Sequence, residues 1–511
     1  VHMDSRRGRR LTVVDRGFRL RLPGGVMECH DWRAFAMLCA GVFVIMMDQN
    51  LMAPNLSQIA GDFGFDDTER DVRLGGHISV AFFLLGLPAA LVIGVLTDVI
   101  QRKRILVWTM ILGQGPCVLA LFVSNYWELF AIRTLTGIAV GGALPIVYSM
   151  VGDLFPANSR SYASMLVGMA MNFGGMFGQG VAGYLGPSFG WRVPFAVVGT
   201  FGLAVAAVVQ NFAVEPRRGV ADGGDGGIGA SAAAAAAAAS AKTASLSSHR
   251  WSHLLREWLK KSAAVFRRRT NVLGFLQGIP GCVPWSIIGV FMNDYLAVDK
   301  GLGVEHATTI MMFFGFGGMF GTITGGILGQ KLYNLKPWYM TAYMGAAAIA
   351  GIFPWLYLVE ADDYGTSAEA MGEKIGVMFF AGLLATMTGV NVRTVIVNVN
   401  APYERGTAFA WFNLTDDLGK GFGPVMSSAL VAHVGRTLAF KLGFGFWAPC
   451  GALCLLCGWT MPRDVNDVRR EMQELAKGRS SPRREGDAGS GGVDVERTSL
   501  LGRGVSSDKL V

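Results

Sequence analysis

Charged residues are scarce in this chain. Asp, Glu, Lys and Arg make up 16% of its 511 residues, whereas 51% are hydrophobic. Stretches of about 20 residues with almost no charge recur along the chain, and about 20 apolar residues are needed to cross a bilayer. A chain of this length has room for several soluble domains, but such a composition argues against them. The composition therefore indicates a protein that spans a membrane many times.

Cysteine is also rare, and its pattern suggests neither a metal site nor a disulfide framework. The seven cysteines are Cys29, Cys39, Cys117, Cys282, Cys450, Cys454 and Cys457. Most of them lie in apolar stretches, and none has metal-ligand spacing to a histidine. We interpret them as small packing residues, and we expect no metal and no cofactor.

The sequence lacks a nucleotide-binding loop and any evident pairing of a nucleophile with a base. Neither ATP-driven transport nor an enzyme activity is therefore predicted. The first 31 residues are rich in arginine and have no apolar core, so they do not resemble a cleavable signal.

Twelve apolar stretches are candidates for membrane-spanning helices, and they fall into two groups of six. The first group is 32–56, 73–97, 104–124, 126–150, 161–187 and 192–213. The second group is 271–296, 305–331, 337–359, 374–398, 407–433 and 437–461. The predicted fold is an all-α membrane protein with two pseudo-symmetric six-helix bundles, over 32–213 and 271–461. Two such halves are typical of secondary transporters built from internal repeats.

Basic residues gather in alternate loops of this arrangement. Roughly 34 of the 45 Lys and Arg fall on the side shared by both termini, which predicts that both termini are cytoplasmic. The excess of positive charge is then a topology signal and not a nucleic-acid footprint. The tail 1–31 is assigned to the cytoplasm, as is the polar tail 462–511, which we expect to be disordered.

The segment 214–270 between the halves is predicted to be a cytoplasmic linker. It contains eight consecutive alanines, 232–239, and then an amphipathic helix. The apolar face of this helix consists of Trp251, Leu254, Leu255, Trp258 and Leu259. Such a helix suits the surface of an anionic bilayer, and packing on the cytoplasmic face of the protein itself is equally compatible with it.

A short charged segment, 94–104, joins the second and third spans. It reads Gly94-Val-Leu-Thr-Asp98-Val-Ile-Gln-Arg102-Lys103-Arg104. Gly94 allows close helix approach, and Asp98 places one anion beside three cations. The segment resembles the loop after the second helix of the major facilitator superfamily, although Val99 and Gln101 replace a basic residue and a glycine. The resemblance implies a cytoplasmic gate, and an ordinary charged connector is the alternative.

The fourth span also resembles this superfamily. It begins Arg133-Thr-Leu-Thr-Gly137-Ile-Ala-Val-Gly141, where glycines four residues apart share one helix face and permit close packing. Within the superfamily, the first half looks most like the spinster group, which includes lysophospholipid and sphingoid-lipid carriers. The shared features are Asp48, the segment 133–153 and the segment 215–219.

Two positions depart from the spinster pattern. Gln49 stands where that group has an arginine, and Val140 stands where it has a glutamate. The resemblance assigns both of those charges to the transport machinery of the group. It therefore supports common ancestry more strongly than it supports lipid transport by this chain.

Ionisable side chains in the middle of a bilayer are costly, so each one is a functional candidate. Asp48 in the first span and Arg133 in the fourth span lie at matching depth, which makes an ion pair possible. The functional interpretation is proton coupling or handling of an anionic substrate. The alternative is a static pair that joins two helices.

The eleventh span carries a second charged cluster. Asp416 and Lys420 are four residues apart and Asp417 and Lys420 are three apart, so both acids can reach the ammonium. One negative charge is left in excess, which Arg393 of the tenth span could neutralise. The cluster is a candidate for proton coupling, with a satisfied charge network as the alternative. Secondary candidates for a cavity are Asn172, Gln277, Asn293 and Asp294.

These observations predict a multi-pass secondary active transporter that moves a small organic solute or lipid by alternating access, with proton coupling favoured. Facilitated diffusion is one alternative, and a non-transporting membrane sensor or scaffold is another. The tail contains Glu496-Arg-Thr-Ser-Leu500-Leu501, which resembles an acidic dileucine signal for clathrin adaptors. Endolysosomal, vacuolar and plasma membranes are all compatible locations.

Overall fold

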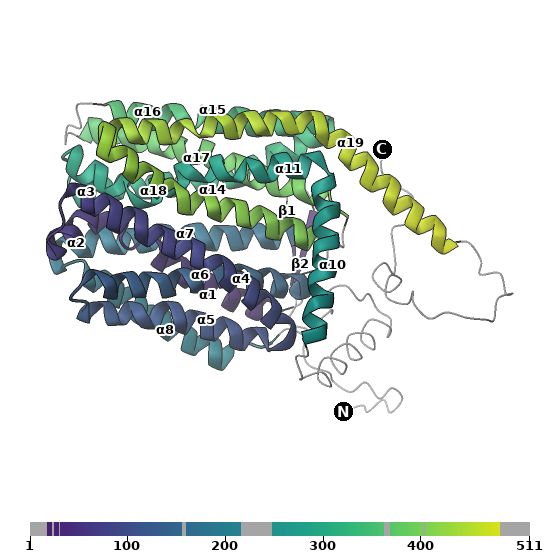
Figure 1. The fold of residues 1–511 in the computed structure, drawn as a ribbon, viewed down its shortest axis with the longest axis horizontal. Coiled ribbons are helices and arrows are strands. Elements are labelled where there is room, and N and C mark those ends of the chain that lie inside the picture. Colours follow the sequence, from purple (N-terminus) through teal and green to yellow (C-terminus); the bar gives the residue numbers. More distant parts are fainter. Residues whose placement is uncertain are drawn as a thin grey trace, which may run out of the picture.

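The computed structural model describes residues 18–22, 25–29, 31–155, 160–215, 248–361, 368–401 and 404–480. Almost all of them are helical, and Figure 1 shows the long helices running side by side. The helices of the first half form one layer and those of the second half form another. The predicted division into two helical halves is therefore confirmed.

The first half is built from short helices between long ones. Its elements are α1 (Trp32–Gln49), η1 (Ala53–Asn55), α2 (Leu56–Phe63), α3 (Asp67–Glu69), η2 (Arg70–His77), α4 (Ile78–Val99), α5 (Arg102–Leu119), η3 (Ala120–Phe122), α6 (Tyr126–Leu154), α7 (Arg160–Phe189) and α8 (Arg192–Phe212). The helix α10 (Ser248–Arg267) follows in the linker.

The second half has the same plan. Its elements are α11 (Arg269–Leu276), α12 (Gly278–Val290), α13 (Met292–Asp294), η4 (Tyr295–Asp299), α14 (Val304–Leu335), α15 (Pro337–Ala350), α16 (Ile352–Glu360), α17 (Ala368–Asn398), α18 (Arg405–Gly445) and α19 (Trp447–Ser480). The segments η2 and η4 are π-helical.

Ten helical stretches among the described residues are long and apolar enough to cross a membrane. The last of them, 405–471, contains two spans, because Gly435 has a φ of 80° that no helix interior adopts and the chain turns there. The helix α7, which has 30 residues, is not one of these ten but is also long enough to span a membrane. This arrangement is consistent with the twelve predicted spans.

Close packing of helices within each half depends on glycine. A Cβ on Gly137 of α6 would overlap the carbonyl oxygen of Phe82 in α4, and one on Gly141 would overlap the same helix a turn later. In the second half, a Cβ on Gly317 of α14 would overlap the carbonyl oxygen of Phe379 in α17. The predicted role of the glycines in the fourth span is confirmed, and the second half repeats it.

The N-terminal tail is not without structure. Two strands, β1 (Phe18–Leu22) and β2 (Gly25–Cys29), form an antiparallel hairpin. In β1, apolar residues alternate with arginines, which is the period of a strand. The described residues are therefore all-α with this one exception, and residues 1–17 lie outside the description.

The C-terminal tail begins as a helix and not as the disordered segment predicted from residue 462. The helix α19 continues to Ser480. Its carboxylate at Asp464 accepts a hydrogen bond of 2.8 Å from the backbone nitrogen of Thr270 and so holds the extension against α11. The remainder of the tail, 481–511, lies outside the description.

The linker helix α10 packs on the protein itself. The ring of Trp258 stacks on that of Trp411 in α18 with a centroid distance of 5.5 Å. The indole nitrogen of Trp411 donates a hydrogen bond of 3.0 Å to Ser262 Oγ, and Val265 is fully buried. Of the two placements expected for this helix, the structure adopts the one on the protein. The alanine run lies outside the description.

Two ends of the bundle are distinguished by these elements. Figure 1 shows α10 lying across the end at which α19 extends beyond the other helices, and α2 and α3 at the opposite end. We call the first the terminal face and the second the distal face.

Candidate functional site

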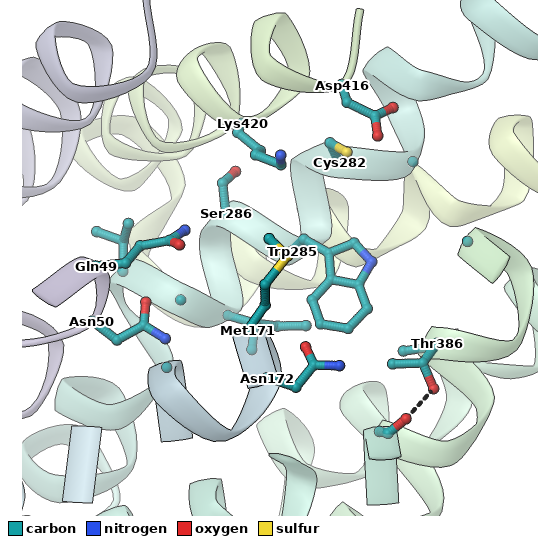
Figure 2. Close-up of a pocket in the computed structure, with 18 of the residues that line it drawn as sticks. Gln49, Asn50, Met171, Asn172, Cys282, Trp285, Ser286, Thr386, Asp416 and Lys420 are labelled. Carbon is teal, nitrogen blue, oxygen red and sulfur yellow. Dashed lines mark hydrogen bonds between the residues drawn. The ribbon is translucent and has the colours of Figure 1, made fainter. Parts of the chain in front are cut away.

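A cavity of about 460 Å³ lies between the two halves. Most of its walls come from α1, α4, α6 and α7 of the first half and from α12, α14, α17 and α18 of the second, with smaller contributions from neighbouring elements such as η2 and α19. Figure 2 shows Trp285 between Asp416 and Lys420 on one side and Asn172 on the other. This volume suits a small organic molecule.

The lining combines aromatic side chains with a few polar groups. Its aromatic members are Phe82, Phe83, Trp285, Phe314, Phe412 and Trp447. Its amide side chains are Gln49, Asn50, Asn172, Gln179 and Gln277. Its charged members are Arg133, Arg393, Asp416 and Lys420. Such a surface can bury an apolar body and orient one or two polar groups.

The predicted pair of Asp48 and Arg133 forms, and it is closed to solvent. The Nη1 atom of Arg133 lies 3.2 Å from Asp48 Oδ1 and 2.9 Å from its backbone oxygen. The Cys117 thiol donates to Asp48 Oδ2 at 3.0 Å. Arg133 lines the cavity, but Asp48 is fully buried behind it. This placement favours the interpretation as a structural pair that joins α1 and α6.

The cluster of the eleventh span is divided between a pair and a separate acid. The ammonium of Lys420 donates to Asp417 Oδ1 at 2.9 Å. Asp416 lines the cavity, as Lys420 does, and no cation of the described residues lies within 4 Å of its carboxylate. Asp416 can therefore gain or lose a proton while the pair of Asp417 and Lys420 stays formed.

Arg393 brings a positive charge to the same cavity. It lies on α17, lines the cavity and is exposed there. No described carboxylate forms an ion pair with it. The cavity therefore contains the cation of Arg393 and the acid of Asp416, which do not form an ion pair with each other.

The secondary candidates separate into two groups. Asn172 and Gln277 line the cavity, in agreement with their assignment. Asn293 and Asp294 do not, because both belong to α13 near the distal face. The amide nitrogen of Asn293 donates to Thr308 Oγ1 at 3.1 Å. Asp294 takes part in a network of ions that joins the two halves.

We call this network the distal ion cluster; its members are Arg70, Asp71, Asp294, Asp299 and Arg436. The Nε and Nη2 atoms of Arg436 donate to the two carboxylate oxygens of Asp71 at 2.9 and 2.8 Å. Its Nη2 atom also donates to Asp294 Oδ2 at 2.9 Å, and its Nη1 atom donates to Asp299. Because Arg70 and Asp71 belong to η2 and the others to the second half, the cluster ties the halves together.

Close contacts of two glycines also pack the same end of the interface. Gly75 lies directly against the ring of Phe291, and Gly76 lies against Ser428 of α18. A Cβ at Gly75 would overlap that ring. The cavity is therefore closed toward the distal face by tight packing together with the distal ion cluster.

The predicted gate segment 94–104 is only partly described. Gly94 and Asp98 belong to α4, but the surroundings of Gly94 and the side chain of Asp98 lie outside the description. Arg102 is buried at the start of α5, where it forms an ion pair with Asp153 and another, at 3.3 Å, with Glu215. This basic residue therefore joins the start of α5 to the end of α6 and to the segment that follows α8.

Sequence reasoning missed most of the distal ion cluster. Arg70, Asp71 and Arg436 lie at the ends of predicted spans, where a charged residue is ordinarily taken for a solvated one. The sequence did contain one indication of buried acids in both halves, since Asp71 and Asp294 each lie next to a long apolar stretch. Their partner could not be identified, because Arg436 lies 365 residues after Asp71.

Comparison with known proteins agrees with this architecture. The family model described as Major Facilitator Superfamily matches residues 38–365. A putative metabolite transport protein of Haemophilus influenzae is 27% identical over 191 residues, which are 37% of this chain and 45% of that protein. The 4-hydroxybenzoate transporter PcaK of Acinetobacter baylyi is 30% identical over 191 residues, 37% of this chain and 40% of that protein. The match thus spans less than half of either relative.

A solved structure extends the similarity over both halves. It is a bacterial homolog to the human lysosomal transporter Spinster, in an inward-facing and unoccupied conformation. It has a TM-score of 0.66 and 18% identity, and the match covers 84% of this chain and 97% of that one. At this identity the similarity concerns the fold alone. Since the family model covers more than half of the sequence, this chain belongs to the Major Facilitator Superfamily.

Proposed function

We propose that this chain is a proton-coupled secondary transporter that carries a small organic solute by alternating access. The cavity between the halves is the substrate site. The observation that carries the proposal is the chemistry of its lining, in which Asp416 faces the cavity beside the pair of Asp417 and Lys420. An acid that is not held by a cation can bind a proton in one access state and release it in the other.

The closed distal face supports an inward-facing state. In this proposal the terminal face is cytoplasmic and the distal face is the outside or the lumen of an organelle, as the distribution of basic residues predicts. The cavity would then exchange its substrate with the cytoplasm in the present conformation. The distal ion cluster would have to separate before the cavity could open to the other side.

The proposal includes common ancestry with the spinster group. It does not extend to the lipid substrates of that group. Gln49 lines the cavity without a charge, and Val140 packs among apolar side chains. The two charges that the group uses are therefore replaced by an amide and by a packing residue. A small solute fits this lining better than a lipid that relies on those charges.

The coupling residue can be tested in proteoliposomes. Labelled 4-hydroxybenzoate is a first probe because a relative transports it, and comparison of metabolites and lipids in vesicles with and without the protein would supply others. Asp416→Asn removes the proton site but keeps shape and hydrogen bonding. The variant should lose accumulation driven by a pH gradient and retain exchange of labelled for unlabelled probe, since exchange needs no net proton movement.

A matched control uses an acid far from the cavity. Asp467 is exposed on α19, so Asp467→Asn should behave as the wild-type protein does. If Asp416→Asn accumulates the probe with wild-type pH dependence, Asp416 is not the coupling group. The same assays on Asp48→Asn then test the first half. Normal pH dependence in both variants would show that neither acid is the coupling group. Absence of pH-driven accumulation in the wild-type protein, with exchange retained, would favour facilitated diffusion instead.

The membrane that holds the transporter is proposed from the tail. Glu496, Leu500 and Leu501 would bind clathrin adaptors and direct the protein to endolysosomal or vacuolar membranes; these residues lie outside the described range. Replacing both leucines by alanine should move a fluorescently tagged protein to the plasma membrane. An unchanged distribution would reject the signal.

A further inference from the structure

The distal ion cluster has an uneven count of charges. It contains two guanidinium groups, from Arg70 and Arg436, and three carboxylates, from Asp71, Asp294 and Asp299. One negative charge is therefore in excess inside a region that is largely closed to water. A buried group of like charges can be relieved by binding one proton.

The three acids differ in their access to solvent. The side chains of Asp71 and Asp294 are 1% exposed, and each is held by Arg436 and lies within 4 Å of Arg70. The side chain of Asp299 is 32% exposed, and Arg436 is its ion-pair partner. Asp299 lies at the end of η4, on the distal side, so it is the acid that a proton from that side can reach.

We propose that closing the distal face takes up one proton at Asp299, so that the distal ion cluster is a proton-sensitive gate as well as a mechanical contact. This proposal rests on the proposed alternating-access function. It adds a proton site to the cycle that is separate from Asp416, because Asp299 does not line the cavity.

The groups around Asp299 determine how the proton is held. Arg436 of α18 contacts it directly, and Arg70 and Asp294 act on it through their charges. Asp71 adds a further negative charge on the far side of the same guanidinium. Other polar and charged groups close to Asp299 have partners of their own. Lys300 donates to the carbonyl of Ala361, Lys441 pairs with Glu360, and the hydroxyl of Tyr295 forms a hydrogen bond with that of Thr437.

The direction of the pH effect follows from the environment of this carboxyl. In the closed arrangement, burial raises the pKa of Asp299, and the negative charge of Asp294 adds to the rise, although Arg436 opposes it. Separation of the halves would leave Asp299 paired with Arg436, since both belong to the second half, but it would admit water to the cluster and so lower the pKa of Asp299 toward the ordinary range. The closed state therefore binds the proton more tightly, so acid favours closure, with the change falling between the ordinary pKa and the raised one.

The experiment measures the conformation directly and needs no substrate. Spin labels are placed at two exposed distal positions, Gln58 of α2 and Glu305 of α14, and their separation is measured by pulsed electron resonance in nanodiscs. Lowering the pH from about 8 to about 4 should increase the closed population several-fold. Asp299→Asn mimics the protonated acid and should remain closed over the whole range.

Three further variants keep the result interpretable. Asp299→Glu retains a titratable acid and should retain the pH response. Arg436→Gln removes the shared cation and should favour the open state at every pH. Asp67→Asn is the control, because Asp67 also contacts Arg70 but is 92% exposed, and it should respond as the wild type does.

The proposal is overturned if the wild-type distance distribution does not change with pH. It is also overturned if Asp299→Asn responds to pH as the wild type does. Neither result affects the transport proposal. That proposal is tested by the flux of labelled probe in the Asp416→Asn variant. Conversely, absence of flux with a normal pH response at the distal face would reject the proposed transport and leave the gate in place.

Discussion

Asp48 and Arg133 lie 85 residues apart in the chain and form an ion pair with an N–O distance of 3.2 Å in the interior of the first half. The carboxylate has no solvent exposure, and Arg133 is 3% exposed. The guanidinium also donates to the backbone oxygens of Asp48 and Gln49, both at 2.9 Å. One arginine on α6 therefore secures the end of α1 through both side-chain and backbone atoms.

Removing one partner of this pair should destabilise the protein. Asp48→Ala leaves the buried cation of Arg133 without its carboxylate, which costs about 3–5 kcal/mol for buried pairs. We expect a marked fall in the midpoint of thermal unfolding in detergent. The double variant Asp48→Asn with Arg133→Gln removes both charges and should recover much of the loss. An unchanged midpoint in Asp48→Ala would show that the pair is dispensable for folding and would return it to the coupling candidates.

The helix contact at Gly137 gives a second prediction. Gly137→Ala places a methyl group against the backbone of α4, so it should destabilise the protein by about 1–3 kcal/mol, as overpacking does. Gly115→Ala is the matched control, since nothing lies within 4 Å of that position. The control should be neutral or slightly stabilising, by up to about 1 kcal/mol. Equal effects in unfolding measurements on both variants would contradict the close approach of α4 and α6.

The docking of α10 gives a third prediction. Trp258→Ala removes the ring that stacks on Trp411, so the helix should separate from the bundle more often. Amide hydrogen exchange over 256–267 should then increase several-fold, with little change in the spans. Arg256→Ala is the control, because Arg256 is exposed. If exchange in this helix is the same in both variants, the stacked rings do not hold it.

The gate segment gives a fourth prediction. In the resemblance to the superfamily, Asp98 helps to hold the cytoplasmic side closed, so Asp98→Asn should shift the protein toward the inward-open state. Labelling of cysteines introduced at the terminal face should become faster, and turnover should fall more than folded yield. Wild-type labelling together with normal flux would reduce 94–104 to a connector between spans.

Much of the fold follows from the local pattern of the sequence. The length and apolarity of each span predict a helix, and glycines four residues apart in the fourth span predict the close contact that Gly137 makes. The pair of Asp48 and Arg133 could be predicted from depth alone, because two opposite charges at one level of a bundle have few other partners. In these cases the residues of one or two short stretches are enough to explain why the helix, the contact or the ion pair forms.

The distal ion cluster required information that no short stretch contains. Whether Asp71 is solvated or buried depends on where α18 places Arg436, and that depends on how the two halves meet. The N-terminal hairpin and the helical extension of α19 to Ser480 were missed for a related reason. Charged, polar segments at chain ends are usually unstructured, and here contacts with the bundle, such as that between Asp464 and Thr270, stabilise the extension.

The π-helical segments η2 and η4 give the distal end a way to rearrange that straight α-helices lack. A π turn bonds each residue to the fifth one on and so holds one residue more than an α turn. When such a turn relaxes to the α form, the side chains beyond it swing by about 100° around the helix axis. Arg70 begins the first of these segments and Asp299 ends the second, so a shift of register confined to a few residues would turn one member of the distal ion cluster relative to the helix next to it. The long helices that follow would keep their hydrogen bonds throughout.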